Sequence, residues 1–190
     1  MKENILIVGF SSLPGGGKDY VADFICRKYG FVKVSPGDII REKLATMKKG
    51  KISREEQQKL QAVLRKKYGK DYVMELCLKK IKSMKSSRAA IAGIRFPADI
   101  AFFKKSKGIK FYNMFIHAPT RIRFERTMER KRADAPLSFK DFTNGDKKEK
   151  EIFNLDKTEK LSDFKFDNRE NDSLELEEKI NKIMKKILSE

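Results

Sequence analysis

Five short apolar runs alternate along the chain with longer segments in which apolar residues recur every three or four positions. The first run, Asn4–Phe10, is almost continuously apolar, as is typical of a parallel strand that is buried on both faces. We predict strands at 4–10, 31–34, 89–94, 110–116 and 164–167. Strands that alternate with helices predict a three-layer α/β fold, with a parallel sheet of about five strands and helices on both faces.

Capping residues mark the ends of the helices between these strands. Ser53 and Glu56 have the spacing of a capping box, and Gly69 follows that helix as a stop. Asp71 is placed to cap the next helix, and Gly30 to end the first one. Further helices are predicted to begin at Pro36, Pro97, Pro119, Ser138 and Leu174. No linker, repeat or low-complexity segment interrupts these elements, so we expect the whole chain to form a single domain.

The composition argues against several classes of protein. No apolar run approaches the roughly 20 residues of a membrane-spanning helix, and the first run is too short for the core of a signal peptide. We therefore expect a cytoplasmic protein with no membrane contact. Cys26 and Cys77 lack CxxC spacing, and with His117 as the single histidine they make no zinc site. We expect both thiols to be free and His117 to be structural.

The net charge of +17 points to an anionic partner. Lysine and arginine number 44 against 27 acidic residues, and such an excess attracts nucleic acid or phosphorylated small molecules. Much of the excess lies in short lysine clusters near predicted helix ends, where cations are favourable in any protein. The charge therefore favours a phosphate-rich ligand, and RNA is a partner that it favours less.

A glycine-rich turn, Ser12-Leu-Pro-Gly-Gly-Gly-Lys-Asp19, joins the first strand to the first helix. Residues without a Cβ let a phosphate chain approach backbone N–H groups, and the start of the helix adds more N–H groups and a positive dipole. The turn nearly matches the P-loop pattern G-x-x-x-x-G-K-[ST], whose lysine reaches the terminal phosphates. We expect the phosphates of a nucleotide to contact Pro14, Gly15, Gly16, Gly17, Lys18, Asp19 and Tyr20.

Four stretches resemble small P-loop kinases. Gly17-Lys-Asp, followed by Val-Ala-Asp-Phe24, resembles the P-loop of phage-type deoxynucleoside monophosphate kinases. Ser35-Pro-Gly-Asp-Ile-Ile-Arg41 is similar to the S-x-G-D-x-x-R stretch of adenylate kinases. Gly93-Ile-Arg-Phe-Pro-Ala-Asp99 resembles the D-x-R-x-P-x-[ED] segment of the phage-type enzymes and of archaeal kinases related to adenylate and cytidylate kinases. Asp163-Phe-Lys-Phe-Asp-Asn168 resembles the last strand of small P-loop kinases, dephospho-coenzyme A kinases included.

This resemblance covers essentially the whole chain and implies a kinase that uses ATP and Mg²⁺ on nucleotide substrates, as a monomer or a homodimer. It implies a core at 1–36, 89–120 and 147–190, an acceptor-binding helical insertion at 37–88 and an arginine-rich lid at 121–146. The acceptor site would comprise Ser35, Asp38, Arg41 and Arg95. The catalytic groups would be Lys18, Arg95, Arg126 and Arg130. Arg126 and Arg130 would bind the phosphates of ATP, and Arg132 is the alternative candidate for this role.

Two positions depart from the general P-loop pattern, and a further one departs from the resembled families. Ser12 stands where the P-loop has its first glycine, and Asp19 replaces the Ser/Thr whose hydroxyl binds Mg²⁺. Ala92-Gly93 stands where the resembled families carry an aspartate that helps to hold the water shell of the metal. A carboxylate can bind Mg²⁺ directly or through water, so Asp19 is the candidate metal ligand.

The expected function is transfer of the γ-phosphoryl group of ATP to a nucleoside or deoxynucleoside monophosphate. Phosphoryl transfer needs positive groups around both substrates rather than a strong base, and Arg41 and Arg95 are placed to clamp the acceptor. Tyr68 and Tyr72 are candidates to hold a nucleobase. Dephospho-coenzyme A kinase is the alternative enzyme. The alternative from another class is a catalytically weak nucleotide- or RNA-binding protein on a kinase scaffold, motivated by the charge and by Ala92.

Overall fold

Five parallel strands form the centre of the molecule. The computed structural model describes residues 4–47, 50, 52–130, 136–169 and 173–189. The strands follow the order β2-β3-β1-β4-β5 across the sheet. Their bounds are β1 (Ile5–Ser12), β2 (Val32–Val34), β3 (Arg88–Ala92), β4 (Ile109–His117) and β5 (Phe164–Asp167). All five predicted strands are confirmed, and the continuously apolar β1 lies in the middle, paired in parallel with β3 and with β4.

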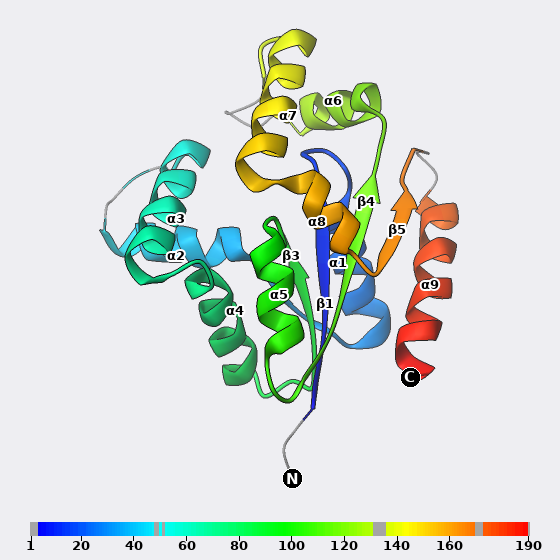
Figure 1. The fold of residues 1–190 in the computed structure, drawn as a ribbon. Helices are drawn as coiled ribbons and strands as arrows, with labels where there is room; N and C mark the ends of the chain where they lie inside the picture. Colours follow the sequence, from blue (N-terminus) through cyan, green and yellow to red (C-terminus); the bar gives the residue numbers. More distant parts are fainter. Residues whose placement is uncertain (1–3, 48–49, 51, 131–135, 170–172, 190) are drawn as a thin grey trace.

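Helices cover both faces of this sheet (Figure 1). In chain order they are α1 (Lys18–Tyr29), α2 (Pro36–Met47), α3 (Arg54–Tyr68), α4 (Tyr72–Ser83), α5 (Pro97–Lys105), α6 (Thr120–Glu129), α7 (Phe139–Phe153), α8 (Leu155–Leu161) and α9 (Ser173–Ser189). The predicted α/β fold of three layers is therefore confirmed. Helices α6 and α7 lie beyond the carboxyl ends of the strands, at the top of Figure 1.

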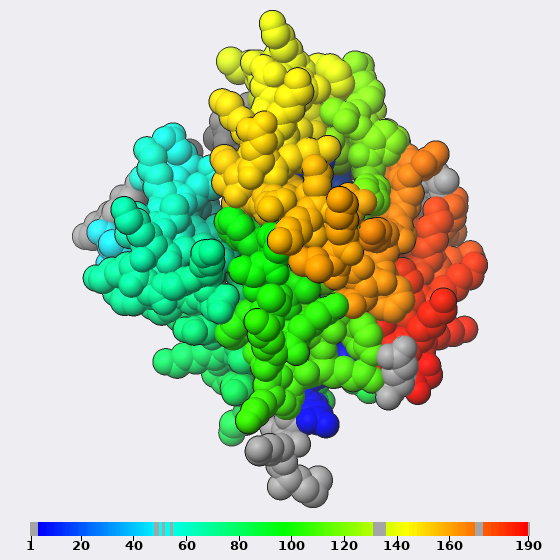
Figure 2. Space-filling view, in the orientation of Figure 1, coloured from blue at the N-terminus to red at the C-terminus, as the bar shows by residue number. Residues whose placement is uncertain are grey.

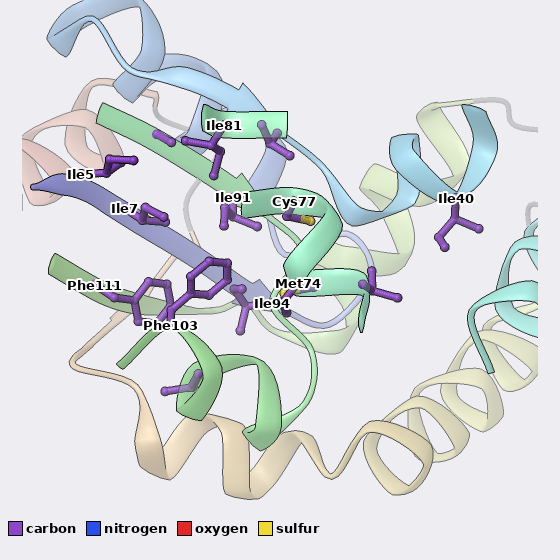
Figure 3. Packing of buried hydrophobic residues seen from close by; sticks show 14 of the residues in the cluster. Ile5, Ile7, Ile40, Met74, Cys77, Ile81, Ile91, Ile94, Phe103 and Phe111 are labelled. Atoms are coloured by element: carbon purple, nitrogen blue, oxygen red, sulfur yellow. The ribbon is translucent and has the colours of Figure 1, made fainter. Parts of the chain in front are cut away.

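Alternate residues of β1 divide the core into two apolar clusters. Ile5 and Ile7 face the cluster that α2, α3, α4 and α5 cover, and Figure 3 shows the side chains of this cluster. Val8 and Phe10 face the opposite cluster, which α1 and α9 cover. Successive side chains of a strand point to opposite faces, so an uninterrupted apolar run is what a strand between two helical layers requires.

Most helix ends follow the predicted caps. Ser53 and Glu56 form the capping box at the start of α3, and Gly30 ends α1 in the left-handed conformation. Asp71 stands at the N-cap position of α4 as predicted, but its side chain makes no capping hydrogen bond. The helix that begins after Ser138 ends at Phe153, where Asn154 adopts φ 50° and starts α8. Nothing in the apolar pattern indicated this break.

None of the helices in the described ranges combines the length and the apolar character that a bilayer-crossing helix needs. Both cysteines are free thiols, and burial raises the pKa of Cys77. The thiolate form of Cys77 is therefore disfavoured, which fits a packing role. His117 lies 3.2 Å from a carboxylate oxygen of Glu159, on the last helix before β5. This pairing agrees with the expected structural role of the histidine.

Candidate functional site

The glycine-rich loop leaves the carboxyl end of β1, where ligands bind in open parallel sheets. The N–H of Gly16 donates to the carbonyl oxygen of Leu13 over 3.0 Å, which closes the turn. Gly15 and Gly17 have φ of 80° and 99°. A Cβ on Gly15 would lie 2.4 Å from the backbone oxygen of Arg123, so the loop packs directly on α6. The backbone conformation and the close packing therefore require glycine at positions 15 and 17, whether or not a ligand binds.

Asn168, at the end of β5, holds the loop from the other side. Its Nδ2 donates to the carbonyl oxygen of Gly16 over 3.0 Å, and its backbone N–H donates to His117 at the end of β4 over 2.7 Å. Arg126 on α6 donates to the backbone oxygen of Asn168 over 3.0 Å. Asn168 thus links the loop, through its side chain, to the sheet and to α6, through its backbone. The sequence showed Asn168 only as part of a resemblance and gave no indication of this role.

Replacing Gly17 by alanine tests how tightly the loop is held. The new Cβ would lie 2.3 Å from Nδ2 of Asn168, at a φ that alanine rarely adopts. Gly30→Ala is the matched control, because Gly30 also has a positive φ but has nothing within 4 Å of the new Cβ. We expect Gly30→Ala to cost about 1 kcal/mol and Gly17→Ala about 1–3 kcal/mol more, from strain and the displaced amide. Urea unfolding measures both, and equal losses would contradict the close packing.

Lys18 and Asp19 form an ion pair at the start of α1, with Nζ and Oδ2 2.7 Å apart. Burial lowers the pKa of Lys18; Asp19 opposes this shift, while the positive charges of Arg95 and Arg130 add to it. Burial also raises the pKa of Asp19, but Lys18, Lys33 and Arg130 outweigh it and hold the value below its usual range. Lys18 is therefore paired with Asp19 and lies within reach of the charges of Arg95 and Arg130.

The predicted catalytic arginines differ in their surroundings. The guanidinium of Arg95 lies 4.7 Å from the ring centre of Phe153 and 3.9 Å from a carboxylate oxygen of Glu149. Arg126 is held against Asn168, and burial, together with the charge of Arg130, lowers its pKa. Arg126 and Arg130 line one cavity of about 380 Å³ between α1, α6 and α9, together with Gly17, Tyr20, Ile122, Glu125, Glu129, Asn168, Ser173 and Leu176. Arg132 lies outside the described residues.

Three of the predicted acceptor residues follow the carboxyl end of β2: Ser35 directly precedes α2, and Asp38 and Arg41 lie on it. The hydroxyl of Ser35 accepts from the N–H of Asp38 over 3.4 Å, and Arg41 pairs with Asp38, both side chains being more than half exposed. A Cβ on Gly93, just after β3, would lie 3.6 Å from Pro36. The start of α2 thus packs beside the end of β3.

The tyrosines that were candidates to hold a nucleobase stack on each other. The ring centres of Tyr68 and Tyr72 are 4.6 Å apart, with 27° between the planes. Neither residue lines the cavity beside α1. The stack joins the end of α3 to the start of α4, so it accounts for both rings without a ligand.

Two buried ion pairs near the loop were not predicted. Arg123 on α6 makes a two-pronged contact with Asp146 on α7, and it also donates to the carbonyl oxygen of Pro14 over 3.1 Å. Arg65 on α3 donates to Asp99 over 2.7 Å. Asp99 is 1% exposed and accepts in addition from the backbone N–H of Arg95 over 3.1 Å. The partners are far apart in sequence, so no local signal could have found them.

The fold is shared with solved structures of shikimate kinases, which match this chain over nearly its whole length. Its overall course matches that of shikimate kinase from Acinetobacter baumannii, with a TM-score of 0.61 at 14% identity over 98% of this chain and 95% of that one. Shikimate kinase from Bacteroides thetaiotaomicron gives 0.58 at 13% identity, over 95% and 96%. An uncharacterized protein from Eubacterium ventriosum gives 0.62 at 17%, over 98% and 99%. At these identities the likeness shows the fold alone.

By sequence, the chain belongs to the UPF0200 protein family. It is 33% identical to the UPF0200 protein of Pyrococcus horikoshii over 189 residues, which is 97% of each chain. It is 34% identical to that of Thermococcus gammatolerans over 148 residues, 76% of each. The UPF0200/UPF0201 protein of Archaeoglobus fulgidus is 31% identical over 165 residues, and the match spans half of its length. No family model matches the chain.

Proposed function

We propose that the protein transfers the γ-phosphoryl group of ATP to a nucleoside or deoxynucleoside monophosphate. The observation that carries this proposal is the glycine-rich loop after β1 with Lys18 at the start of α1, where burial lowers the pKa of the lysine and the charges of Arg95 and Arg130 add to that shift. Like charges are held together there although they repel each other. An anion with several charges, such as a polyphosphate chain, would relieve that repulsion.

Each group has a separate role in this proposal. The backbone N–H groups of the loop and Lys18 bind the terminal phosphates of ATP, and the start of α1 adds its dipole. The cavity beside Tyr20 receives the rest of the ATP molecule, with Arg126 and Arg130 on its wall. Arg95 clamps the phosphate of the acceptor, for which its fork of donors is suited. Phosphoryl transfer depends on positioning and charge stabilisation and needs no strong base. His117, which pairs with Glu159, therefore has no catalytic role in this proposal.

The donors present fit Mg²⁺. The described residues contain no group of three or more His, Cys, Asp or Glu side chains that could cage a metal ion. Mg²⁺ does not need such a cage, because it typically binds one or two carboxylates together with phosphate oxygens and water. Asp19 is 42% exposed and lies beside Lys18, so it would hold the ion against the ATP phosphates. When bound, the ion neutralises charge on the phosphates.

The test is formation of ADP from ATP and Mg²⁺ with a panel of acceptors. The panel contains ribo- and deoxynucleoside monophosphates, dephospho-coenzyme A and shikimate, each with a control that lacks the acceptor. We expect turnover that depends on one or a few nucleoside monophosphates. Turnover with dephospho-coenzyme A alone would move the assignment to that kinase. ATP binding without turnover on any acceptor would overturn the proposal and favour a nucleotide- or RNA-binding scaffold, and steeply salt-dependent RNA binding would identify the latter.

A further inference from the structure

A second cavity lies between helices α3 and α7, beside the start of α5. It measures about 260 Å³. Helix α3 contributes Gln58, Gln61 and Arg65, while Phe96, Ile152 and Phe153 come from the start of α5 and the end of α7. Figure 2 shows the surfaces of α3 and α7 meeting above α5. We call this cavity the α3–α7 cleft.

One wall of the α3–α7 cleft is aromatic. The rings of Phe96 and Phe153 meet edge to face, with centres 5.1 Å apart and 82° between the planes. The guanidinium of Arg65 lies 4.3 Å from the ring centre of Phe96. Phe153 is 4% exposed, but the neighbouring Ile152 remains 63% exposed at the rim. An apolar wall with a few polar groups opposite is typical of sites for small organic molecules, and a flat ring makes good contact with such a wall.

The opposite wall carries polar groups that lack partners. Gln58 and Gln61 are half-buried, and within the described part of the chain neither side-chain amide has a hydrogen-bond partner. The terminal nitrogens of Arg65 donate to Asp99 and to the carbonyl oxygen of Lys70, but its buried Nε has no acceptor among the described residues. Buried donors are costly to leave unpaired. A carboxamide offers a donor beside an acceptor, which matches the edge of a nucleobase.

Arg95 connects this cleft to the phosphate site. Its guanidinium lies 4.7 Å from the ring centre of Phe153 in the cleft wall, and its charge lowers the pKa of Lys18 on the glycine-rich loop. The carboxylate of Asp99 holds both sides together, because it accepts from the backbone N–H of Arg95 and from Arg65. A molecule whose phosphate lies on Arg95 therefore has the α3–α7 cleft next to it for its remaining part.

We propose that the α3–α7 cleft binds the nucleobase of the acceptor, with Gln58 and Gln61 hydrogen-bonding to its edge and the phenylalanine wall against its face. The inference rests on the proposed kinase function and adds the element that selects the acceptor. The side-chain amides of Gln58 and Gln61, both on α3, then select the base. The stacked Tyr68 and Tyr72 take no part in this selection.

Three glutamines on one helix allow a matched test. Gln58→Ala and Gln61→Ala each remove an amide from the cleft, whereas Gln57→Ala removes one outside it, near Gly37. We expect each cleft variant to lower kcat/KM for the preferred acceptor about tenfold, because it loses one or two hydrogen bonds to the base. The change should lie mainly in KM. The ranking of the bases in the panel should change, and KM for ATP should not. Gln57→Ala should leave all three quantities unchanged.

The outcomes separate this inference from the proposed function. Acceptor-dependent turnover with an unchanged base ranking in both cleft variants would overturn the role of the cleft and leave the kinase assignment intact. If the wild-type protein turns over no acceptor, calorimetric binding of the same monophosphates decides. Binding that Gln58→Ala and Gln61→Ala weaken and Gln57→Ala does not would support the cleft without the kinase. Binding that no variant weakens, or no binding at all, would overturn the inference.

Discussion

Replacing Lys18 by alanine is expected to lower kcat/KM for phosphoryl transfer about 10³-fold. Lys18 directly follows the glycine-rich loop at the start of α1, and burial together with the charges of Arg95 and Arg130 lowers the pKa of its ammonium. A preorganised positive group beside the transferring phosphate stabilises charge that builds up in the transition state, and removing one such group typically costs about 10²–10³-fold. The loss should appear in kcat as well as in ATP affinity, because the group acts more strongly on the transition state than on bound ATP.

Lys28→Ala is the control for this experiment. Lys28 lies on the same helix, is exposed and contacts only the ring of Phe24 in the described structure, so its removal changes the net charge by the same amount away from the loop. Initial rates at several ATP concentrations separate kcat from KM. An active Lys18→Ala variant, within a few-fold of wild type, would refute the assignment of the loop as the phosphate site.

The fold was predictable because its signals are local. An uninterrupted apolar run is enough to indicate β1, and glycines followed by Lys18 are enough to indicate the turn after it. Each predicted strand needs only its own composition and the helix that follows it. The rules that govern parallel sheets leave few topologies for five strands, but the observed order β2-β3-β1-β4-β5 comes from the structure.

Long-range pairs were not predictable from one sequence. Arg65 and Asp99 are 34 residues apart, and Arg123 and Asp146 are 23 apart. Nothing in the local pattern distinguishes Arg123, buried at 3% exposure, from the exposed Arg121 on the same helix. The sequence assigns Arg126 and Arg130 to the ligand and gives no role to Arg123, which forms an ion pair within the protein. Which charges a ligand can use depends on tertiary packing, and the helix pattern does not carry that information.

Those two pairs also suggest how the loop is positioned. Arg123 ties the carbonyl of Pro14 to α7 through Asp146, and Arg65 ties Arg95 to α3 through Asp99. The glycine-rich loop and Arg95 are thus each held in place by one buried carboxylate. The site residues are partly exposed, but the ion pairs that hold them in place are buried. The geometry of the site therefore depends on residues that no ligand touches.

Replacing Asp146 by alanine is expected to cost about 3–5 kcal/mol of unfolding free energy. Arg123 and Asp146 are both nearly inaccessible, with side chains 4% and 9% exposed. Removing the carboxylate leaves a buried guanidinium without its counter-charge, which is far more costly than removing an exposed pair. The loss is a large part of the 5–15 kcal/mol that typically stabilises a domain. Because Arg123 also donates to Pro14, we expect ATP binding to weaken as well.

Two companion variants separate charge from hydrogen bonding. Asp146→Asn keeps an acceptor for Arg123 and should lose less than Asp146→Ala, since part of the contact survives. Glu151→Ala, at an exposed position of the same helix, should change stability by about 0.5 kcal/mol or less. Urea unfolding followed by circular dichroism gives the midpoint and the slope for each variant. An Asp146→Ala variant that unfolds at the same urea concentration as Glu151→Ala would show that water reaches Arg123, and the bracing of the glycine-rich loop by α7 would have to be abandoned.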